Sequence, residues 1–252
     1  MRTALVTGAT DGHGRLVALG LLERGWRVLV HGRDRARGEA VVARADGNAE
    51  LLLADLASKA EVRRLAREVL ARGDVELLVN NAGIASAERR ESADGIELTF
   101  AVNHLAHVIL TEDVVVGGAP VRRVVNVASI GQAPFDWDDP LLERSYDGYR
   151  AYAQSKLAQV AFTFDLAELW SRRGIGMDAI HPATLMDTTM VRGSFGRPHS
   201  TVEEGAAATL ALIEREGTGR FFDGMREARA NNTAYDAEER ERIHALTARL
   251  MG

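Results

Sequence analysis

Short, mostly apolar segments alternate with segments of helical periodicity along most of this chain. The apolar segments are residues 4–6, 28–30, 51–53, 77–79, 124–127 and 175–180. A continuous apolar run, unlike one that alternates with polar residues, is typical of a strand covered on both faces. Because strands that alternate with helices favour a parallel sheet with right-handed crossovers, the pattern predicts a doubly wound α/β fold. We expect about seven parallel strands with helices on both faces of the sheet.

Two segments interrupt the alternation. Residues 131–148 are acidic and aromatic, and residues 183–201 are rich in Thr, Gly and Met. Each follows a predicted strand, and such folds bind ligands in loops at the carboxyl ends of their strands. We therefore expect both loops to wall a substrate pocket, with ordinary surface loops as the alternative. A strand at 220–222 and a helix at 236–250 close the chain, and no linker or repeat divides it, so we expect a single domain over 1–252.

The composition excludes several classes of protein. The chain has no cysteine, so it contains no disulfide, no thiolate metal site and no cysteine nucleophile. A net charge of −5 argues against nucleic-acid binding, and no apolar run approaches the roughly 18 residues of a membrane span. His104, His107 and His181 lack the carboxylate and thiol partners of a zinc site, so we expect structural or solvated roles and no metal. The first residues lack a secretory signal, and we expect a cytoplasmic protein.

A glycine-rich loop lies between the first strand and the first helix. It reads Thr7-Gly8-Ala9-Thr10-Asp11-Gly12-His13-Gly14. Glycine permits tight turns and close backbone approach, and the N-terminus of the following helix offers unpaired N–H groups to a phosphate. Placement directly after a strand predicts the dinucleotide site of a Rossmann fold, with an ordinary turn as the alternative. The loop residues expected to bind the dinucleotide are Gly8, Thr10, Asp11, Gly12, His13 and Gly14.

The end of the second strand indicates which dinucleotide is bound. A carboxylate there binds the ribose 2′-hydroxyl of NAD, whereas an arginine accommodates the 2′-phosphate of NADP. Gly32 stands where the carboxylate is expected, and Arg33 follows it. We therefore expect a preference for NADP(H), with NAD(H) as the alternative. Asp11 argues mildly the other way because it places a negative charge near the phosphate, and a solvated cation is the alternative for Arg33.

Tyr152 and Lys156 are candidates for proton transfer. They are four positions apart in a predicted helix and therefore lie on one face, one turn apart. A free tyrosine has a pKa of about 10, and a nearby ammonium favours the phenolate and lowers that pKa. We expect Tyr152 to exchange a proton with a carbonyl or alcohol oxygen, and Lys156 also to hold the nicotinamide ribose.

Ser129 and Asn103 complete the candidate catalytic set. Ser129 closes the strand at 124–128, where its hydroxyl is expected to bind the substrate oxygen. Asn103 lies among apolar neighbours in a helix, so its amide needs partners, such as a backbone carbonyl or a relay water leading to Lys156. The alternatives are a turn or cap residue for Ser129 and a satisfied structural amide for Asn103.

Together these motifs resemble the short-chain dehydrogenase/reductase family of the standard soluble type. The matching motifs are Thr7-Gly8-x-x-x-Gly12-x-Gly14, Asp55-Leu56, Asn80-Asn81-Ala82-Gly83, Asn103, Ser129 and Tyr152-x-x-x-Lys156. They occur in the family's order. Within the family the chain is most similar to the retinol-dehydrogenase-like branch, through residues 102–107, 135–139, 145–146 and 152–158.

The resemblance implies a role for each motif. Asp55 would contact the adenine, and the catalytic tetrad would be Asn103, Ser129, Tyr152 and Lys156. The further cofactor contacts that the resemblance implies are Leu56, Asn81, Ala82, Gly83, Tyr152, Lys156, Pro182, Thr184 and Thr188. The family usually has Gly and Thr where this chain has Ala183 and Asp187, so Thr184 or Thr188 would replace the usual nicotinamide contact. The family also implies a homodimer or homotetramer formed through the helices that hold Asn103 and Tyr152.

We therefore expect an NADP(H)-dependent oxidoreductase that interconverts a ketone or aldehyde and an alcohol by hydride transfer, with Tyr152 as general acid/base. Its expected partner is a small-molecule carbonyl or alcohol substrate. The first alternative is a non-enzymatic NADP-binding sensor or interaction protein on the same fold, which would not need the tetrad. The second is an epimerase or dehydratase with tightly held NAD, against which Arg33 counts.

Overall fold

A computed structural model of the chain describes residues 1–194 and 196–252. Its strands form one sheet with the order β3-β2-β1-β4-β5-β6-β7-β8. The strands are β1 (Thr3–Val6), β2 (Arg27–Gly32), β3 (Ala49–Leu53), β4 (Val75–Asn80), β5 (Arg123–Val127), β6 (Gly176–His181), β7 (Phe221–Asp223) and β8 (Arg226–Ala228). The first seven pair in parallel and β8 pairs antiparallel with β7.

The predicted doubly wound fold is confirmed, and β8 is an addition to it. Only Gly224 and Met225 separate β7 from β8. A connection of this length is typical of a tight hairpin, which reverses the chain instead of carrying it through a crossover helix. The eighth strand is therefore antiparallel at the edge of an otherwise parallel sheet.

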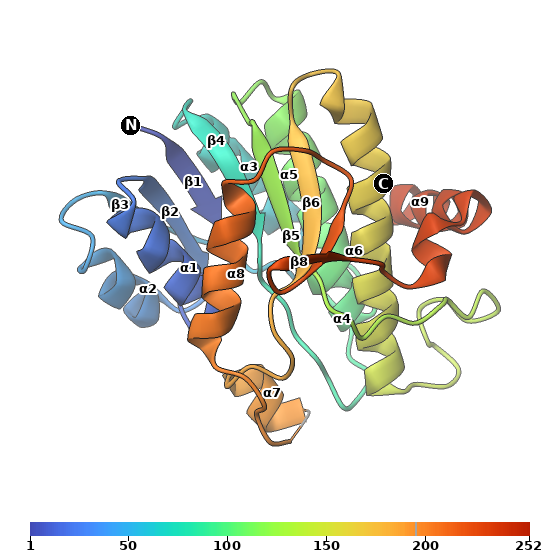
Figure 1. Cartoon of the computed structure of the whole chain (residues 1–252). Helices are drawn as coiled ribbons and strands as arrows, with labels where there is room; N and C mark the ends of the chain where they lie inside the picture. The colour runs from blue at the N-terminus through green and yellow to red at the C-terminus, as the bar shows by residue number, and fades with distance from the viewer. Residues whose placement is uncertain (195) are drawn as a thin grey trace.

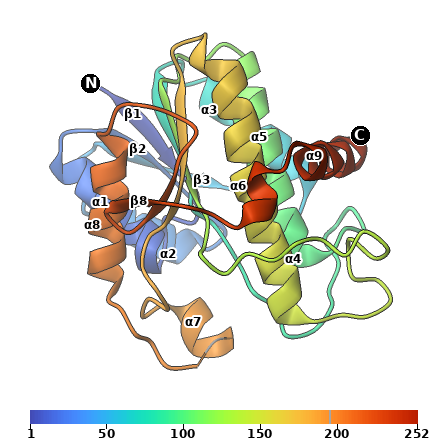
Figure 2. The ribbon, with the colours of Figure 1, turned by 45° about the vertical axis from the view of Figure 1, so that its right-hand side comes forward.

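Helices cover both faces of the sheet (Figures 1 and 2). One face carries α1 (Gly12–Glu23), α2 (Arg35–Val42) and α8 (Val202–Ile213). The other carries α3 (Lys59–Leu70), α5 (Ala106–Val116) and α6 (Gly148–Ser171), with α9 (Ala237–Met251) packed outside α6. The shorter elements are α4 (Leu98–Phe100), a π-helical turn (Ala101–Leu105), α7 (Thr189–Ser194) and a 3-10 turn (Asn232–Tyr235).

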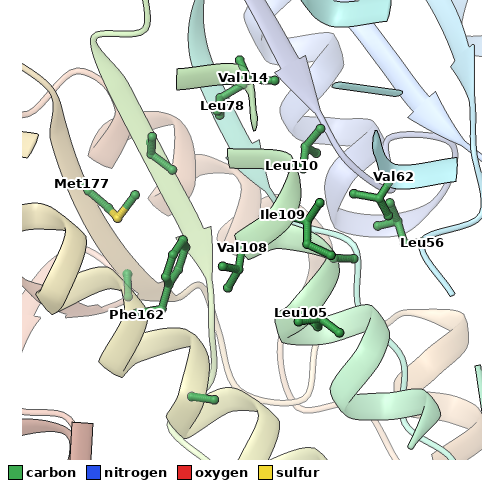
Figure 3. Packing of buried hydrophobic residues seen from close by; sticks show 14 of the residues in the cluster. Leu56, Val62, Leu78, Leu105, Val108, Ile109, Leu110, Val114, Phe162 and Met177 are labelled. Carbon is green, nitrogen blue, oxygen red and sulfur yellow. The ribbon is translucent and has the colours of Figure 1, made fainter. Parts of the chain in front are cut away.

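Successive side chains of each strand enter opposite cores. Leu5 and Leu29 belong to the core beneath α3, α5 and α6, part of which Figure 3 shows. Their neighbours Ala4, Val6 and Val28 belong to the core beneath α1 and α8. All five side chains are buried. Because successive strand residues point to opposite faces, a sheet covered on both faces requires continuous apolar strands.

Helix α8 is an element that the sequence analysis did not assign. The Thr201 hydroxyl accepts the N–H of Glu204 at 3.1 Å, and the Glu204 carboxylate accepts the N–H of Thr201 at 3.0 Å. This reciprocal pair is a capping box, so a sequence signal for the helix start was present. The loop expected at 183–201 contains α7, and residue 195 of that loop lies outside the described residues.

Helix α9 covers part of the face through which the predicted oligomer would form. Its Arg240 pairs with Asp165 of α6 at 2.7 Å, and its Thr247 hydroxyl lies 2.9 Å from Nε2 of His104 in the π-helical turn. Its Ile243 belongs to the same core as α6. Association through this part of the face would require α9 to move. The homodimer or homotetramer stays a prediction, and it would use the parts of the helices holding Asn103 and Tyr152 that α9 leaves uncovered.

Two features are absent from residues 1–194 and 196–252. No helix in these ranges is long and apolar enough to cross a membrane. No group of three or more His, Asp or Glu side chains there is arranged to hold a metal ion. Neither observation tests the cytoplasmic location, which stays a prediction.

Candidate active site

A cavity of about 710 Å³ lies at the carboxyl ends of the parallel strands. All of the predicted cofactor residues line it, namely Gly8, Thr10, Asp11, Gly12, His13, Gly14, Arg33, Asp55, Leu56, Asn81, Ala82, Gly83, Tyr152, Lys156, Pro182, Thr184 and Thr188. Ser129 lines it as well, whereas Asn103 does not. These residues follow different strands, and a parallel sheet brings the carboxyl ends of its strands to one edge.

The glycine-rich loop packs closely against residues 81–83. Gly8 has a φ of +64°, and a Cβ at this position would lie 2.9 Å from Cα of Ala82. A side chain there would therefore be strained in conformation and would displace the neighbouring backbone. The Asn81 Nδ2 donates to the carbonyl of Thr7 at 2.7 Å, which holds the two segments together. Glycine at position 8 therefore lets the loop pack directly against Ala82.

The side-chain carboxylate of Asp11 caps the N-terminus of α1. Its Oδ1 accepts the N–H of Gly12 at 2.8 Å, at the start of α1. Its Oδ2 accepts from the Thr189 hydroxyl at 3.0 Å and from Arg37 at 3.3 Å. The carboxylate is therefore hydrogen-bonded to α7 and paired with an arginine of α2, which offsets its effect on a nearby phosphate.

Two histidines are buried at the loop, His13 within it and His31 beside it. The Nδ1 of His31 accepts the N–H of Gly8 at 3.2 Å, and burial lowers the pKa of His31 to about 4. His13 lies 2.7 Å from Oδ1 of Asn81 and 3.0 Å from the hydroxyl of Thr209 in α8, and burial lowers its pKa as well. Both rings are neutral at physiological pH. His13 therefore links the loop to α8.

Tyr152, Ser129 and Lys156 meet in the cavity. The hydroxyl of Tyr152 is hydrogen-bonded to Ser129, whose Oγ also accepts the N–H of Gly131 at 3.0 Å. The Nζ of Lys156 donates to the carbonyl of Val127 at 2.8 Å and lies 5.8 Å from the centroid of the Tyr152 ring. Residues from α6 and from the end of β5 thus lie together, as the sequence analysis expects.

Burial shifts the pKa of both Tyr152 and Lys156. It raises the pKa of Tyr152 above 10, and the opposing effect of the hydrogen bond with Ser129, which lowers this pKa, is smaller. It lowers the pKa of Lys156 from 10.5 to about 7. The expectation that Lys156 lowers the pKa of Tyr152 is therefore wrong for the chain by itself. In a site of low dielectric both charged forms lose hydration, so the ammonium that would stabilise the phenolate is itself disfavoured.

Asn103 is hydrogen-bonded beside the cavity. It lies in the π-helical turn, a widened turn that is frequent at functional sites. Its Oδ1 accepts the N–H of Ile84 at 2.8 Å, and its Nδ2 donates to the Ile84 carbonyl and to the Ser155 hydroxyl, both at 3.0 Å. A backbone carbonyl is thus one of its partners, as expected. The amide holds the chain after Gly83 against α6 and does not itself reach the cavity.

The two predicted pocket loops contribute unequally. Of residues 131–148, all described, only Gly131 lines the cavity. Trp137 stacks on Phe135 with ring centroids 5.0 Å apart, and its indole N–H donates to Glu239 of α9 at 2.9 Å. The expectation that this loop walls the pocket is wrong, because Trp137 packs against α9 and Phe135 packs edge-on against Phe100 of α4. The loop at 183–201 does line the cavity, with most of its first nine residues.

Part of the cavity wall consists of residues that sequence reasoning did not select. They include Ile84, Ala85 and Ile130, and Tyr149 at the start of α6. The first three follow β4 or β5, and position after a strand was the signal that could have found them. None carries a charge, whereas the lining residues Asp11, Arg33 and Asp55 follow β1, β2 and β3. The cavity therefore has a charged side and an apolar side.

Comparison with known proteins finds relatives along the whole chain. The model of the short chain dehydrogenase family matches residues 2–197. Retinol dehydrogenase 13 of Homo sapiens is 32% identical over 284 residues, which cover 100% of this chain and 85% of that protein. Polyprenol dehydrogenase of Mus musculus is 37% identical over 286 residues, which cover 100% of this chain and 84% of that protein.

Solved structures share the architecture. A crystal structure of an uncharacterized protein from Mycobacterium Paratuberculosis superposes with a TM-score of 0.85 at 28% identity, covering 100% of this chain and 93% of that one. The Pseudomonas aeruginosa RhlG/NADP active-site complex superposes with a TM-score of 0.71 at 26% identity, covering 88% of this chain and 94% of that one. The second of these similar structures is an NADP complex.

Proposed function

Because the chain belongs to the short-chain dehydrogenase/reductase family, we propose that it interconverts an alcohol with a ketone or aldehyde and uses NADP(H). Its relatives are retinol and polyprenol dehydrogenases, so the expected retinol-dehydrogenase-like branch is confirmed, as is an oxidoreductase of CH–OH groups. The observation that carries the proposal is the meeting of Tyr152, Ser129 and Lys156 in a cavity that extends to the glycine-rich loop.

The glycine-rich side of the cavity fits a dinucleotide. Gly8, Gly12 and Gly14 line it without side chains, and the N-terminus of α1 directs the positive end of its helix dipole toward a pyrophosphate there. Asp55, Leu56 and residues 81–83 line the same cavity and provide contacts for the rest of the cofactor. When bound, a nicotinamide cofactor supplies or accepts the hydride.

The residues of the chain handle the proton. Tyr152 donates its hydroxyl proton to the carbonyl oxygen during reduction and takes a proton from the alcohol during oxidation. Ser129, hydrogen-bonded to Tyr152, offers a second polar contact to the same oxygen and stabilises the charge that develops there. Lys156, anchored on the Val127 carbonyl and with a pKa of about 7, binds and releases a proton near neutral pH.

The end of β2 supports NADP(H) over NAD(H). A Cβ at Gly32 would lie 2.3 Å from Cγ2 of Thr10, so a carboxylate side chain fits there only if Thr10 moves. Arg33 lies 3.7 Å from Asp55, in a pair whose side chains are 67% and 44% exposed. An exposed pair of this kind contributes at most about 1 kcal/mol, so a 2′-phosphate can recruit Arg33 at little cost.

The substitution Arg33→Gln is expected to raise the KM for NADPH by about tenfold or more and to leave the KM for NADH nearly unchanged. The reason is that a hydrogen bond to a charged group contributes roughly 1.5–3 kcal/mol, and only NADPH carries the 2′-phosphate. Steady-state kinetics with each cofactor measures the effect. The matched control is Arg35→Gln, because Arg35 is 69% exposed and pairs with Glu39 away from the cavity. An equal rise in both KM values would contradict the preference for NADP(H).

The apolar side of the cavity supports a neutral, apolar substrate. This side is lined by Ile84, Ile130, Met190 and Val191. Two relatives of the protein are named for retinol and polyprenol. A charged substrate group would lose hydration at these side chains without gaining a partner.

NADPH oxidation with a panel of apolar and charged ketones and aldehydes tests this function. We expect turnover of apolar compounds and little turnover of compounds with a carboxylate near the carbonyl. Binding of NADPH without turnover of any carbonyl would instead favour the non-enzymatic sensor on the same fold.

A further inference from the structure

A fully buried histidine, His107, connects the glycine-rich loop to the π-helical turn that holds Asn103. It lies in the first turn of α5, directly after the π-helical turn. Its Nδ1 lies 3.1 Å from the carbonyl oxygen of Asn103, and its Nε2 lies 3.0 Å from the hydroxyl of Thr7. His107 is not among the residues that line the cavity. It is therefore placed to act on the site through its neighbours.

The hydrogen bonds determine which ring nitrogen carries the hydrogen. A carbonyl oxygen only accepts, so Nδ1 of His107 carries the hydrogen and donates it to Asn103. The Nε2 is then an acceptor and takes the hydroxyl proton of Thr7. That hydroxyl accepts the backbone N–H of Asn81 at 2.9 Å and that of Ala82 at 3.0 Å. Its one donor and both of its lone pairs are thereby used.

One hydroxyl thus holds both backbone segments that would carry the cofactor. Thr7 directly precedes Gly8, and Asn81 and Ala82 directly precede Gly83. Gly83 in turn faces the catalytic groups, since a Cβ there would lie 3.5 Å from Oδ1 of Asn103 and 3.6 Å from Nζ of Lys156. A displacement of residues 81–83 would therefore move a bound cofactor relative to Lys156.

Gln159 of α6 adds a second connection to Lys156. Its Oε1 accepts a hydrogen bond from Nζ of Lys156 at 3.0 Å. Its Nε2 lies 3.5 Å from Nδ1 of His107, which is a packing contact because both nitrogens carry hydrogens in this tautomer. Burial lowers the pKa of His107 to about 3, so the ring stays neutral at physiological pH and keeps its acceptor nitrogen. The same ring is therefore packed between the glycine-rich loop and the helix that carries Lys156.

We propose that His107 is a positioning residue for the cofactor, because its neutral ring fixes the Thr7 hydroxyl and the Asn103 carbonyl relative to one another. The inference rests on the proposed function, since it requires that this cradle bind NADP(H). A ring of similar size without nitrogen atoms would fill the same volume but would leave the Asn103 carbonyl without this donor. The Thr7 hydroxyl would then have only one acceptor for its hydrogen, the carbonyl of Val79 at the longer distance of 3.4 Å.

Three substitutions at His107 separate packing from hydrogen bonding. His107→Phe keeps a ring and removes both hydrogen bonds. His107→Gln places an amide oxygen at about the reach of Nε2 and can accept from Thr7, whereas His107→Asn places an amide N–H at about the reach of Nδ1 and can donate only to Asn103. Calorimetric titration gives the Kd of each variant for NADPH and for NADH, and urea unfolding reports whether each variant is folded.

We expect His107→Phe to raise the Kd for NADPH by about tenfold, His107→Gln to restore most of the affinity and His107→Asn to restore little. A folded Phe variant with the Kd of the unmodified chain would overturn the proposal. If the Phe variant does not fold, equal Kd values for the Gln and Asn variants would overturn it. An unmodified chain that binds neither NADPH nor NADH would contradict the proposed function instead, so the two failures are distinguishable.

Discussion

Replacing Tyr152 by phenylalanine is expected to lower kcat for carbonyl reduction by about 10²–10⁴-fold, the usual contribution of general acid–base catalysis. The phenylalanine keeps the buried ring and its packing in α6, and it loses only the hydroxyl that is hydrogen-bonded to Ser129. The carbonyl oxygen is then left without its proton donor. The Kd for NADPH is expected to change little. Stopped-flow measurement of NADPH oxidation gives the rate, and calorimetry gives the Kd.

Tyr149 offers a matched control for this substitution. It also lines the cavity, but its side chain is largely exposed in the first turn of α6. Tyr149→Phe removes a hydroxyl from the same helix and is expected to retain most of the activity. A Tyr152→Phe variant that keeps the full rate would show that another group donates the proton, and the assignment of Tyr152 would be wrong.

The free energy of unfolding is expected to fall steeply as the pH is lowered below about 6.5. Burial lowers the pKa of His31 to about 4 and the pKa values of His104 and His107 to about 3. In the unfolded chain a histidine has a pKa of about 6.5, so the unfolded chain binds these protons first. The stabilisation is therefore full above about pH 6.5 and is lost as the pH falls toward the folded pKa values. Together the three rings lower the stability by about 4 kcal/mol per pH unit in this window.

Urea unfolding followed by tryptophan fluorescence at pH 7.5, 6.5 and 5.5 measures this dependence. His104→Gln keeps an N–H for Thr247 and removes one titrating ring, so the slope is expected to decrease by about 1.4 kcal/mol per pH unit. His199→Gln is the control, because the side chain of His199 is exposed in the folded chain and should leave the slope as it was. A stability that is constant between pH 7.5 and 5.5 would show that these rings are hydrated or charged when folded.

Much of the fold and of the cofactor site is encoded in local patterns. The continuous apolar runs predicted a sheet covered on both faces, and the glycine-rich loop between a strand and a helix predicted the cavity that the structure contains. The spacing of Tyr152 and Lys156 predicted a shared helix face, because backbone hydrogen bonds set the helix period. The start of α8 was also readable, since Thr201 and Glu204 have the spacing of a capping box.

Other properties depended on contacts between distant segments. The loop at 131–148 has the composition of a pocket wall, but Trp137 packs toward Glu239 of α9, about a hundred residues away. His107 reads as an unremarkable helical histidine until the sheet brings Thr7 beside it. A pattern of neighbouring residues cannot show which distant residue will contact Trp137 or His107.

The sequence by itself determined the alternation of most strands and helices, the glycine-rich loop and the position of Tyr152 and Lys156 on one helix face, since each is set by residues a few positions apart. The tertiary structure alone decided that Tyr152 has a raised pKa, that Lys156 has a lowered one and that Asn103 holds Ile84 beside the cavity. The physical reason is that hydration is lost, and hydrogen-bond partners are gained, only when segments far apart in the chain pack around the same group.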